Sequence, residues 1–116
     1  MSINLNSVTN ITGSLSDLAP LTALTRIDVA DCPNITGTIN DLTQPFTAMN
    51  VYNTPITGEL IEFVKTQRSV GRTTGSCSSG WWGHNITFNG VEPSLSQSNL
   101  SWTENTITLG DVTVNQ

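Results

Sequence analysis

The segment LTRIDVADCPNI, residues 24–35, decides the expected fold, because the spacing of its apolar residues changes along it. The step is three residues from Leu24 to Ile27, two from Ile27 to Val29, and then three again. A single helix or a single strand keeps one period throughout. The segment therefore predicts a short strand, with Ile27 and Val29 facing inward, that runs into a turn.

The same pattern recurs on both sides of this segment. The triplet Ile-Thr-Gly begins at residues 11, 35 and 56, so its copies are 24 and 21 residues apart. A candidate strand with two inward apolar residues precedes each triplet; these pairs are Ile3 and Leu5, Ile27 and Val29, and Met49 and Val51. Recurrence every roughly 20–29 residues is typical of leucine-rich repeats, which stack into a solenoid. We therefore expect an α/β solenoid, short, right-handed and leucine-rich-repeat-like, over residues 1–78.

Residues 58–71, GELIEFVKTQRSVG, interrupt this strand-rich pattern with a helical one. Leu60, Phe63 and Val64 have the spacing of one helix face, and glycines flank the segment. We therefore expect the fold to contain one helix, over about residues 59–70.

The two ends of the expected solenoid differ. Residues 73–78 are expected to form a fourth strand of its sheet, and the period-two segments beyond predict a C-terminal antiparallel β cap over residues 79–116. Both parts are expected to form one domain, residues 1–116. The first strand has no such cap, and open edge strands attract other strands. We expect self-association or a protein partner there, with a module of a longer protein as the third explanation.

The charge balance limits the class of partner. Nine acidic and four basic residues give a net charge of −5, and an acidic surface repels nucleic acid. Three of the basic residues, Lys65, Arg68 and Arg72, lie close together, and we interpret them as the solvated face and C-terminal end of the helix, with an anion site as the alternative. The sequence has no signal peptide and no apolar run that could enter a membrane, so localisation stays unknown.

Residue types that perform catalysis or bind metals are few. His84 is the single histidine, so a histidine-based metal site lacks ligands. Cys32 and Cys77 are expected to be free, buried thiols, with a bridge between them as the alternative. No nucleophile and base stand in a recognisable motif. We therefore expect no enzyme, no cofactor and no metal.

Two sets of residues are candidates for binding. If Ile27 and Val29 face inward, alternation places Arg26 and Asp28 on the outer sheet face, and the same parity places Asn50 and Tyr52 there. The adjacent residues Trp81 and Trp82 must face opposite sides, so one is expected to be partly exposed, where it can stack on a sugar or anchor a protein contact. The alternatives are an ordinary solvated face and two buried tryptophans. The candidate site residues are Arg26, Asp28, Asn50, Tyr52, Trp81 and Trp82.

The segment LTRIDVADCPNI and the segment FTAMNVYNTPI, residues 46–56, resemble bacterial leucine-rich repeats. The Ile-Thr-Gly triplets, the helix GELIEFVKTQR and the tail NLSWTENTITL resemble, more specifically, short repeat modules of gut Bacteroidales and their bacteriophages. This resemblance, which covers nearly the whole chain, implies a non-catalytic structural or protein-interaction module of a virion or cell surface, acting in assembly or attachment. A carbohydrate-binding module that uses an exposed Trp is the alternative, since one scaffold hosts many functions.

Overall fold

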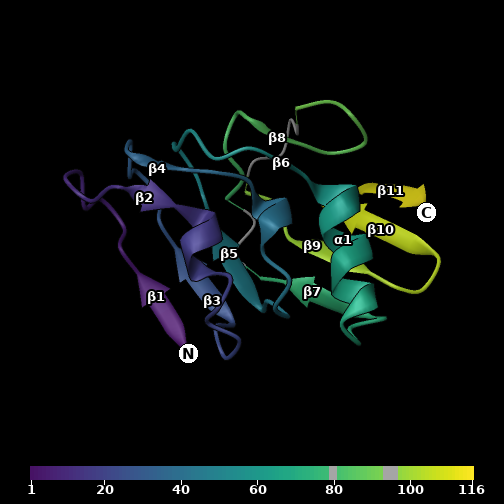
Figure 1. The fold of residues 1–116 in the computed structure, drawn as a ribbon. Coiled ribbons are helices and arrows are strands. Elements are labelled where there is room, and N and C mark those ends of the chain that lie inside the picture. Colours follow the sequence, from purple (N-terminus) through teal and green to yellow (C-terminus); the bar gives the residue numbers. More distant parts are fainter. Residues whose placement is uncertain (79–80, 93–96) are drawn as a thin grey trace.

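Three short parallel strands form a sheet on the N-terminal side of the molecule (Figure 1). The computed structural model describes residues 1–78, 81–92 and 97–116. The strands stand in the order β1 (Ser2–Asn4), β3 (Arg26–Asp28) and β5 (Ala48–Asn50). Ile27 is aligned with Ile3 on one side and Met49 on the other, and Ile27 and Met49 are buried. The odd-numbered residues of these strands therefore face the core, and the even-numbered ones lie on the outer face.

Two shorter parallel pairs accompany this sheet. β2 (Gly13–Ser14) pairs with β4 (Ile35–Thr36), and β6 (Gly58–Glu59) pairs with β8 (Ile86–Thr87). The short 3₁₀ helices η1 (Leu15–Leu18) and η2 (Ile39–Asp41) follow β2 and β4.

Three threonine hydroxyls, those of the second and third Ile-Thr-Gly triplets and that of Thr87, make the same contact with a neighbouring segment. Each donates a hydrogen bond of 3.3 Å to a glycine carbonyl oxygen in the neighbouring segment; the pairs are Thr36 with Gly13, Thr57 with Gly37, and Thr87 with Gly58. Such bonds stabilise the pairing of adjacent segments. Ile86 and Thr87, which the sequence placed in the cap, therefore add a further member to the series.

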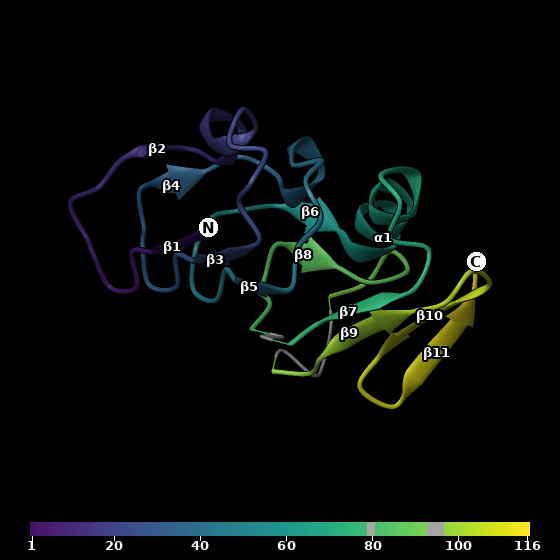
Figure 2. The same cartoon turned by 90° about the horizontal axis from the view of Figure 1, so that it is seen from below.

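The expected helix is confirmed as α1 (Leu60–Ser69). Its apolar residues Leu60, Phe63 and Val64 are fully buried, and the Glu59 side chain caps its first turn. Figure 2 shows η1, η2 and α1 along one side of the molecule and the parallel sheet on the other, with the core between them. In the part of the chain that the structure describes, no helix is both long enough and apolar enough to cross a bilayer.

The largest sheet is antiparallel and contains the C-terminal strands (Figure 2). Its order is β11 (Val112–Asn115), β10 (Thr106–Leu109), β9 (Leu100–Trp102) and β7 (Gly75–Cys77). The chain leaves α1 through a turn at Gly71, whose φ of 99° suits glycine. Since β7 pairs with β9, this sheet joins the two parts that were expected to divide after residue 78.

The expectation of a leucine-rich-repeat-like solenoid is wrong for this chain. A solenoid adds successive repeats to one continuous sheet, whereas the described residues form four separate small sheets. The expected fourth strand of the solenoid sheet at residues 73–78 is also corrected, because β7 pairs antiparallel with β9 and belongs to the other sheet. The C-terminal strands form a sheet of their own with β7 and do not cap a solenoid. The fold is a small, compact α/β structure, with one α-helix in the described residues.

Candidate binding surface

The outer face of the parallel sheet brings together most of the residues predicted to bind. The strand register aligns Asn4, Asp28 and Asn50 in one row, and a parallel bridge to Asn50 adds Trp81 to its end. The Val51 N–H fixes this bridge by donating to the Trp81 carbonyl oxygen at 3.1 Å. Aligned residues of parallel strands point to the same face. We name the following set the outer-face cluster: Asn4, Arg26, Asp28, Asn50, Tyr52 and Trp81.

Tyr52 and Trp81 form an aromatic pair at one end of the outer-face cluster. Their ring centroids are 5.4 Å apart and their planes make an angle of 69°. This edge-to-face arrangement is one that the ring quadrupoles favour. Each side chain is 37% exposed. The pair therefore offers a fixed apolar contact surface beside a polar row.

Trp82 does not belong to this surface, and its inclusion among the binding residues is corrected. It is 1% exposed and packs in the core, where its Nε1–H donates to the Ser98 carbonyl oxygen at 3.2 Å. Alternation along the chain predicted that the two tryptophans face opposite sides. The bridge between Trp81 and Asn50 determines which of them faces outward.

Asp28 and Asn50 also end their strands, a role that sequence reasoning missed. Each side-chain Oδ1 accepts a hydrogen bond from the N–H two residues later; the pairs are Asn4 with Asn6 at 3.1 Å, Asp28 with Ala30 at 3.2 Å, and Asn50 with Tyr52 at 3.2 Å. One residue further, φ becomes positive, at Ser7 (63°), Asp31 (59°) and Asn53 (55°). The sequence did contain the signal. Asn or Asp recurs once in each strand, at residues 4, 28 and 50, and three positions later stands a residue type that suits turns.

Arg26 and Asp28 lie on a shallow depression of about 150 Å³ on the outer face. Ser2, Asn4 and Ala48 contribute to the same lining. The Asp28 carboxylate accepts hydrogen bonds from the Asn6 side-chain amide at 3.2 and 3.4 Å, so its orientation is held. Arg26 is exposed. The depression therefore presents one oriented carboxylate and one exposed guanidinium to a partner.

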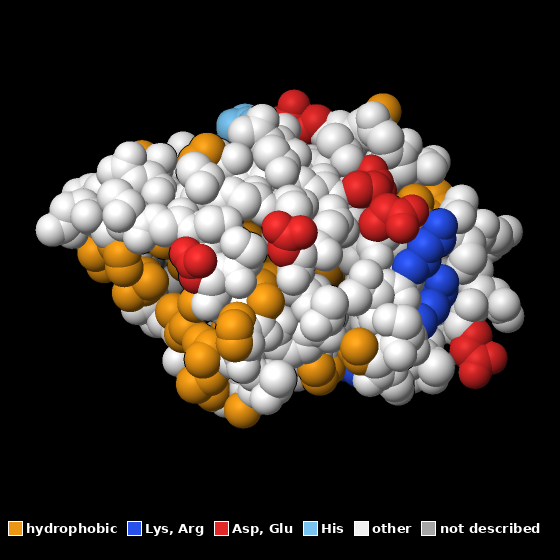
Figure 3. Space-filling model, viewed as in Figure 1, with side chains coloured by type: hydrophobic (Ala, Val, Ile, Leu, Met, Phe, Trp, Pro, Cys, Tyr) orange, Lys and Arg blue, Asp and Glu red, His pale blue; other side chains and the backbone are white. Residues whose placement is uncertain are grey.

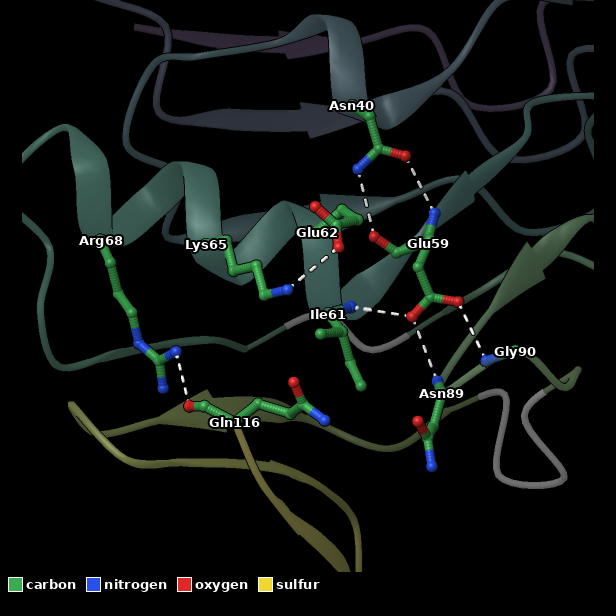
Figure 4. A network of polar contacts seen from close by, with 9 residues as sticks. All are labelled: Asn40, Glu59, Ile61, Glu62, Lys65, Arg68, Asn89, Gly90 and Gln116. Carbon is green, nitrogen blue, oxygen red and sulfur yellow. Dashed lines mark hydrogen bonds and ion pairs between the residues drawn. The ribbon is translucent and has the colours of Figure 1, made fainter.

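Glu59 is a second polar centre that sequence reasoning missed (Figure 4). Its Oε1 accepts hydrogen bonds from the N–H groups of Ile61 at 3.0 Å and Asn89 at 3.1 Å. Its Oε2 accepts from the Thr87 hydroxyl at 2.6 Å and the Gly90 N–H at 3.1 Å. The carboxylate therefore joins the start of α1 to the turn at Asn89 and Gly90.

These bonds favour the ionised form of Glu59. Partial burial raises its pKa, but the hydrogen bonds from Thr87 and three backbone N–H groups outweigh burial and hold the pKa below the ordinary value of 4.5. Asn40 fixes the Glu59 backbone, accepting from its N–H at 2.9 Å and donating to its carbonyl oxygen at 3.1 Å. A carboxylate with four donors in place positions a loop and is a poor proton acceptor.

Arg68 lies in the last turn of α1, which agrees with the interpretation of these cations as the C-terminal end of the helix. The arginines do more than face solvent, however, because both Arg68 and Arg72 fasten the antiparallel sheet to α1. Arg68 donates to three backbone carbonyl oxygens; these belong to Thr103 at 3.0 Å, Thr106 at 3.2 Å and Gln116 at 2.9 Å. Figure 4 shows the contact with Gln116. The Arg72 guanidinium lies 5.0 Å from the centroid of the Trp102 ring, a cation–π contact. Lys65, in contrast, makes an exposed ion pair with Glu62 at 3.2 Å.

The two thiols are buried, whereas the histidine is exposed. Cys32 and Cys77 are free and buried, which confirms the predicted state of both. Burial raises the pKa of Cys77 to about 12, an effect that Arg72 only partly offsets, so the thiol stays protonated near neutral pH. His84 is exposed, with Nδ1 2.7 Å from Glu92 Oε1. Within residues 1–78, 81–92 and 97–116, no cluster of three His, Cys, Asp or Glu residues could hold a metal ion.

Comparisons with protein-family models, with curated proteins and with solved structures find no match to this chain. The resemblance to bacterial repeat modules therefore remains a hypothesis. The outer-face cluster is the feature from which a function can be argued.

Proposed function

We propose that this protein is a non-catalytic interaction module that binds a protein partner through the outer-face cluster. The aromatic pair of Tyr52 and Trp81 carries the proposal, because both rings are partly exposed and lie 5.4 Å apart next to oriented polar groups. Tyr and Trp are enriched at protein interfaces and contribute much of the binding energy there. A virion or bacterial cell surface as the setting rests on the resemblance alone.

The polar part of the cluster supports the proposal through its preorganisation. Asp28 and Asn50 are held by hydrogen bonds to the backbone at 3.2 Å, and Asp28 is also held by Asn6. Side chains that are already ordered lose less conformational entropy when a partner binds. Arg26 lies on the same depression and supplies a guanidinium, a group favoured at interfaces.

A displayed random-peptide library tests the proposal without a known partner. Selection on the intact wild-type protein alone should enrich peptides that bind through the aromatic pair. Because removal of a central interface aromatic typically costs about 2 kcal/mol or more, these peptides should bind Trp81→Ala and Tyr52→Ala about 30-fold more weakly. Val112→Ala, on the exposed part of β11, is the matched control and should bind them like the wild type. Peptides that bind all three variants equally would contradict the proposal.

A carbohydrate-binding module is the second candidate, and the exposed Trp81 ring favours it. Indole faces stack on sugar rings, and the Asn50 side chain next to Trp81 in the row carries an amide that can bond to hydroxyl groups. A glycan array probed with the wild type and with Trp81→Ala separates the two functions. Glycan signals that disappear in the variant would favour this candidate, and an array without signals would exclude it for the glycans tested.

A further inference from the structure

The end of the molecule formed by β1, β2 and η1 is less well covered than the segment behind it. Ile3, Leu5 and Ile11 are only partly buried, whereas the corresponding residues of the next segment are 2% (Ile27), 1% (Val29) and 7% (Ile35) exposed. Large side chains are also exposed at this end; these are Met1 (54%), Val8 (37%) and Leu21 (37%). Figure 3 shows hydrophobic side chains gathered on this side of the molecule. We name residues 1–25 the N-terminal end.

The N-terminal end also has a hollow and two strand edges. The hollow, of about 120 Å³, is lined mainly by apolar side chains; these include Leu5, Ile11, Leu15, Leu18, Val29 and Ile35. In the described part of the chain, β1 pairs with β3 alone and β2 with β4 alone. The Leu5 N–H donates to the Asp28 carbonyl oxygen at 2.8 Å, so the odd-numbered residues bond toward β3. The N–H and C=O groups of Ser2 and Asn4 therefore face the open edge.

The N-terminal end carries far fewer charged side chains than the rest of the molecule. Of nine acidic and four basic residues, only Asp17 lies within residues 1–25. The amino group of Met1 donates to the Ala23 carbonyl oxygen at 3.0 Å. Two copies that each carry a net charge of −5 repel one another least when their nearly uncharged ends meet.

We propose that two copies of this chain associate through the N-terminal end, with their β1 strands paired antiparallel about a two-fold axis. In this register Ile3 lies opposite Ile3 of the second copy, and Ser2 lies opposite Asn4. The two symmetry-related Ser2–Asn4 pairs then exchange backbone hydrogen bonds, because Ser2 and Asn4 have their N–H and C=O groups on the open edge, whereas the Ile3 pair between them does not. The two parallel sheets become one continuous sheet, and a two-fold interface needs only one self-complementary surface.

A second copy fits this end better than a charged partner does. The end offers an open strand edge, an apolar hollow and exposed apolar side chains. The strand edge of one copy can therefore pair with that of the other, and the exposed apolar side chains of each copy can be covered by the other. Antiparallel pairing brings the start of one β1, where Met1 bonds to Ala23, toward the loop after the other β1, which carries Val8. An acidic or basic partner would find few opposite charges here, which disfavours a steered complex with either.

Sedimentation equilibrium of the intact protein tests the proposal. The wild type should reach a dimer with a concentration-dependent weight average, and Val8→Glu and Leu21→Glu should each weaken the dimer about tenfold or more, since they place a charge in an apolar contact. Val112→Glu, an equally drastic change at an exposed position of β11, should dimerise like the wild type. Circular dichroism melting checks that each variant is folded.

Amide hydrogen exchange provides a second readout. The Asn4 N–H should exchange freely in dilute protein and become protected as the concentration rises, whereas the Leu5 N–H, bonded to Asp28, should be protected throughout. A wild type that stays monomeric up to about 1 mM would overturn the proposal. So would a dimer that survives Val8→Glu and Leu21→Glu but is lost in Val112→Glu. Neither result bears on the aromatic pair, so the proposed function is tested separately.

Discussion

The parallel and antiparallel halves of this molecule are held together in different ways. In the parallel half, neighbouring segments make recurring contacts, such as the Thr-to-Gly hydrogen bonds of 3.3 Å and the bonds that end each strand. In the antiparallel half, Arg68 and Arg72 reach from α1 and its C-terminal turn to hold the sheet in place. The antiparallel half also buries Leu100, Ile107 and Leu109 in the shared core, but its polar attachment to α1 rests on a few long side chains. Single substitutions should therefore act unequally on the two halves.

Trp82→Ala should have the largest effect, because Trp82 is buried where the two halves meet. Its ring is 1% exposed, and its Nε1–H bonds to Ser98 near the start of β9. Loss of a buried Trp typically costs about 3–5 kcal/mol of unfolding free energy. Urea unfolding measures the cost, with Trp81→Ala as the control that should lose less than about 1 kcal/mol. Equal losses in the two variants would contradict the inward and outward assignment of the pair.

Gly58→Ala should cause the next largest loss of unfolding free energy, and it tests the close contacts of the parallel half. A Cβ atom at Gly58, where φ is 156°, would overlap Ile39 Cγ1, so the core must shift. Overpacking of this kind costs about 1–3 kcal/mol. Gly71→Ala is the control, because φ there is 99° and no atom lies within 4 Å of the added Cβ. Chemical unfolding should show the smaller loss in Gly71→Ala, and the reverse order would refute the packing argument.

Arg68→Ala should loosen the antiparallel sheet while the parallel sheet stays intact. It removes the hydrogen bonds to the carbonyl oxygens of Thr103, Thr106 and Gln116, for a loss of about 1–2 kcal/mol. Hydrogen exchange should accelerate in β10 and β11 but not in β3. Lys65→Ala, which removes only an exposed ion pair, should change the unfolding free energy by less than about 0.5 kcal/mol. Equal acceleration in both sheets would show that the halves are not held separately.

Glu59 should give the parallel half a pH-dependent contribution to stability. Its folded pKa is lowered below 4.5, so the contribution is fully present above that value and is lost as the pH falls through the folded pKa. Glu59→Gln should be less stable than the wild type at neutral pH, and the difference in unfolding free energy should shrink on acidification. A difference that stays constant down to about pH 3 would contradict this assignment.

The sequence could predict features that depend on local periodicity. The spacing of Leu60, Phe63 and Val64 placed α1 within a residue or two, and period two placed Ile27 and Met49 in the core. The same periodicity led to the wrong expectation of a solenoid. Recurring short strands are compatible with a parallel sheet that stops after β5, and nothing local marks where the stacking ends.

The features that the sequence could not predict depend on distant partners. Arg68 bonds to residues 35 and 48 positions away, so its role could not be separated from that of an exposed helix cation such as Lys65. Alternation required one tryptophan of the pair to face outward, but the bridge to Asn50 decides that it is Trp81. Glu59 was missed because its donors at Thr87, Asn89 and Gly90 lie beyond the helix that it caps.

Backbone amide chemical shifts test the proposed binding surface most directly. Isotope-labelled protein would be titrated with a peptide selected on the intact wild-type protein. Contact through this surface should shift the amides of Asp28, Asn50 and Tyr52 and the indole N–H of Trp81, while the amides of β10 and β11 stay unchanged. Shifts confined to β10 and β11, with the Trp81 indole unmoved, would contradict the proposal that the protein binds through the outer face of its parallel sheet.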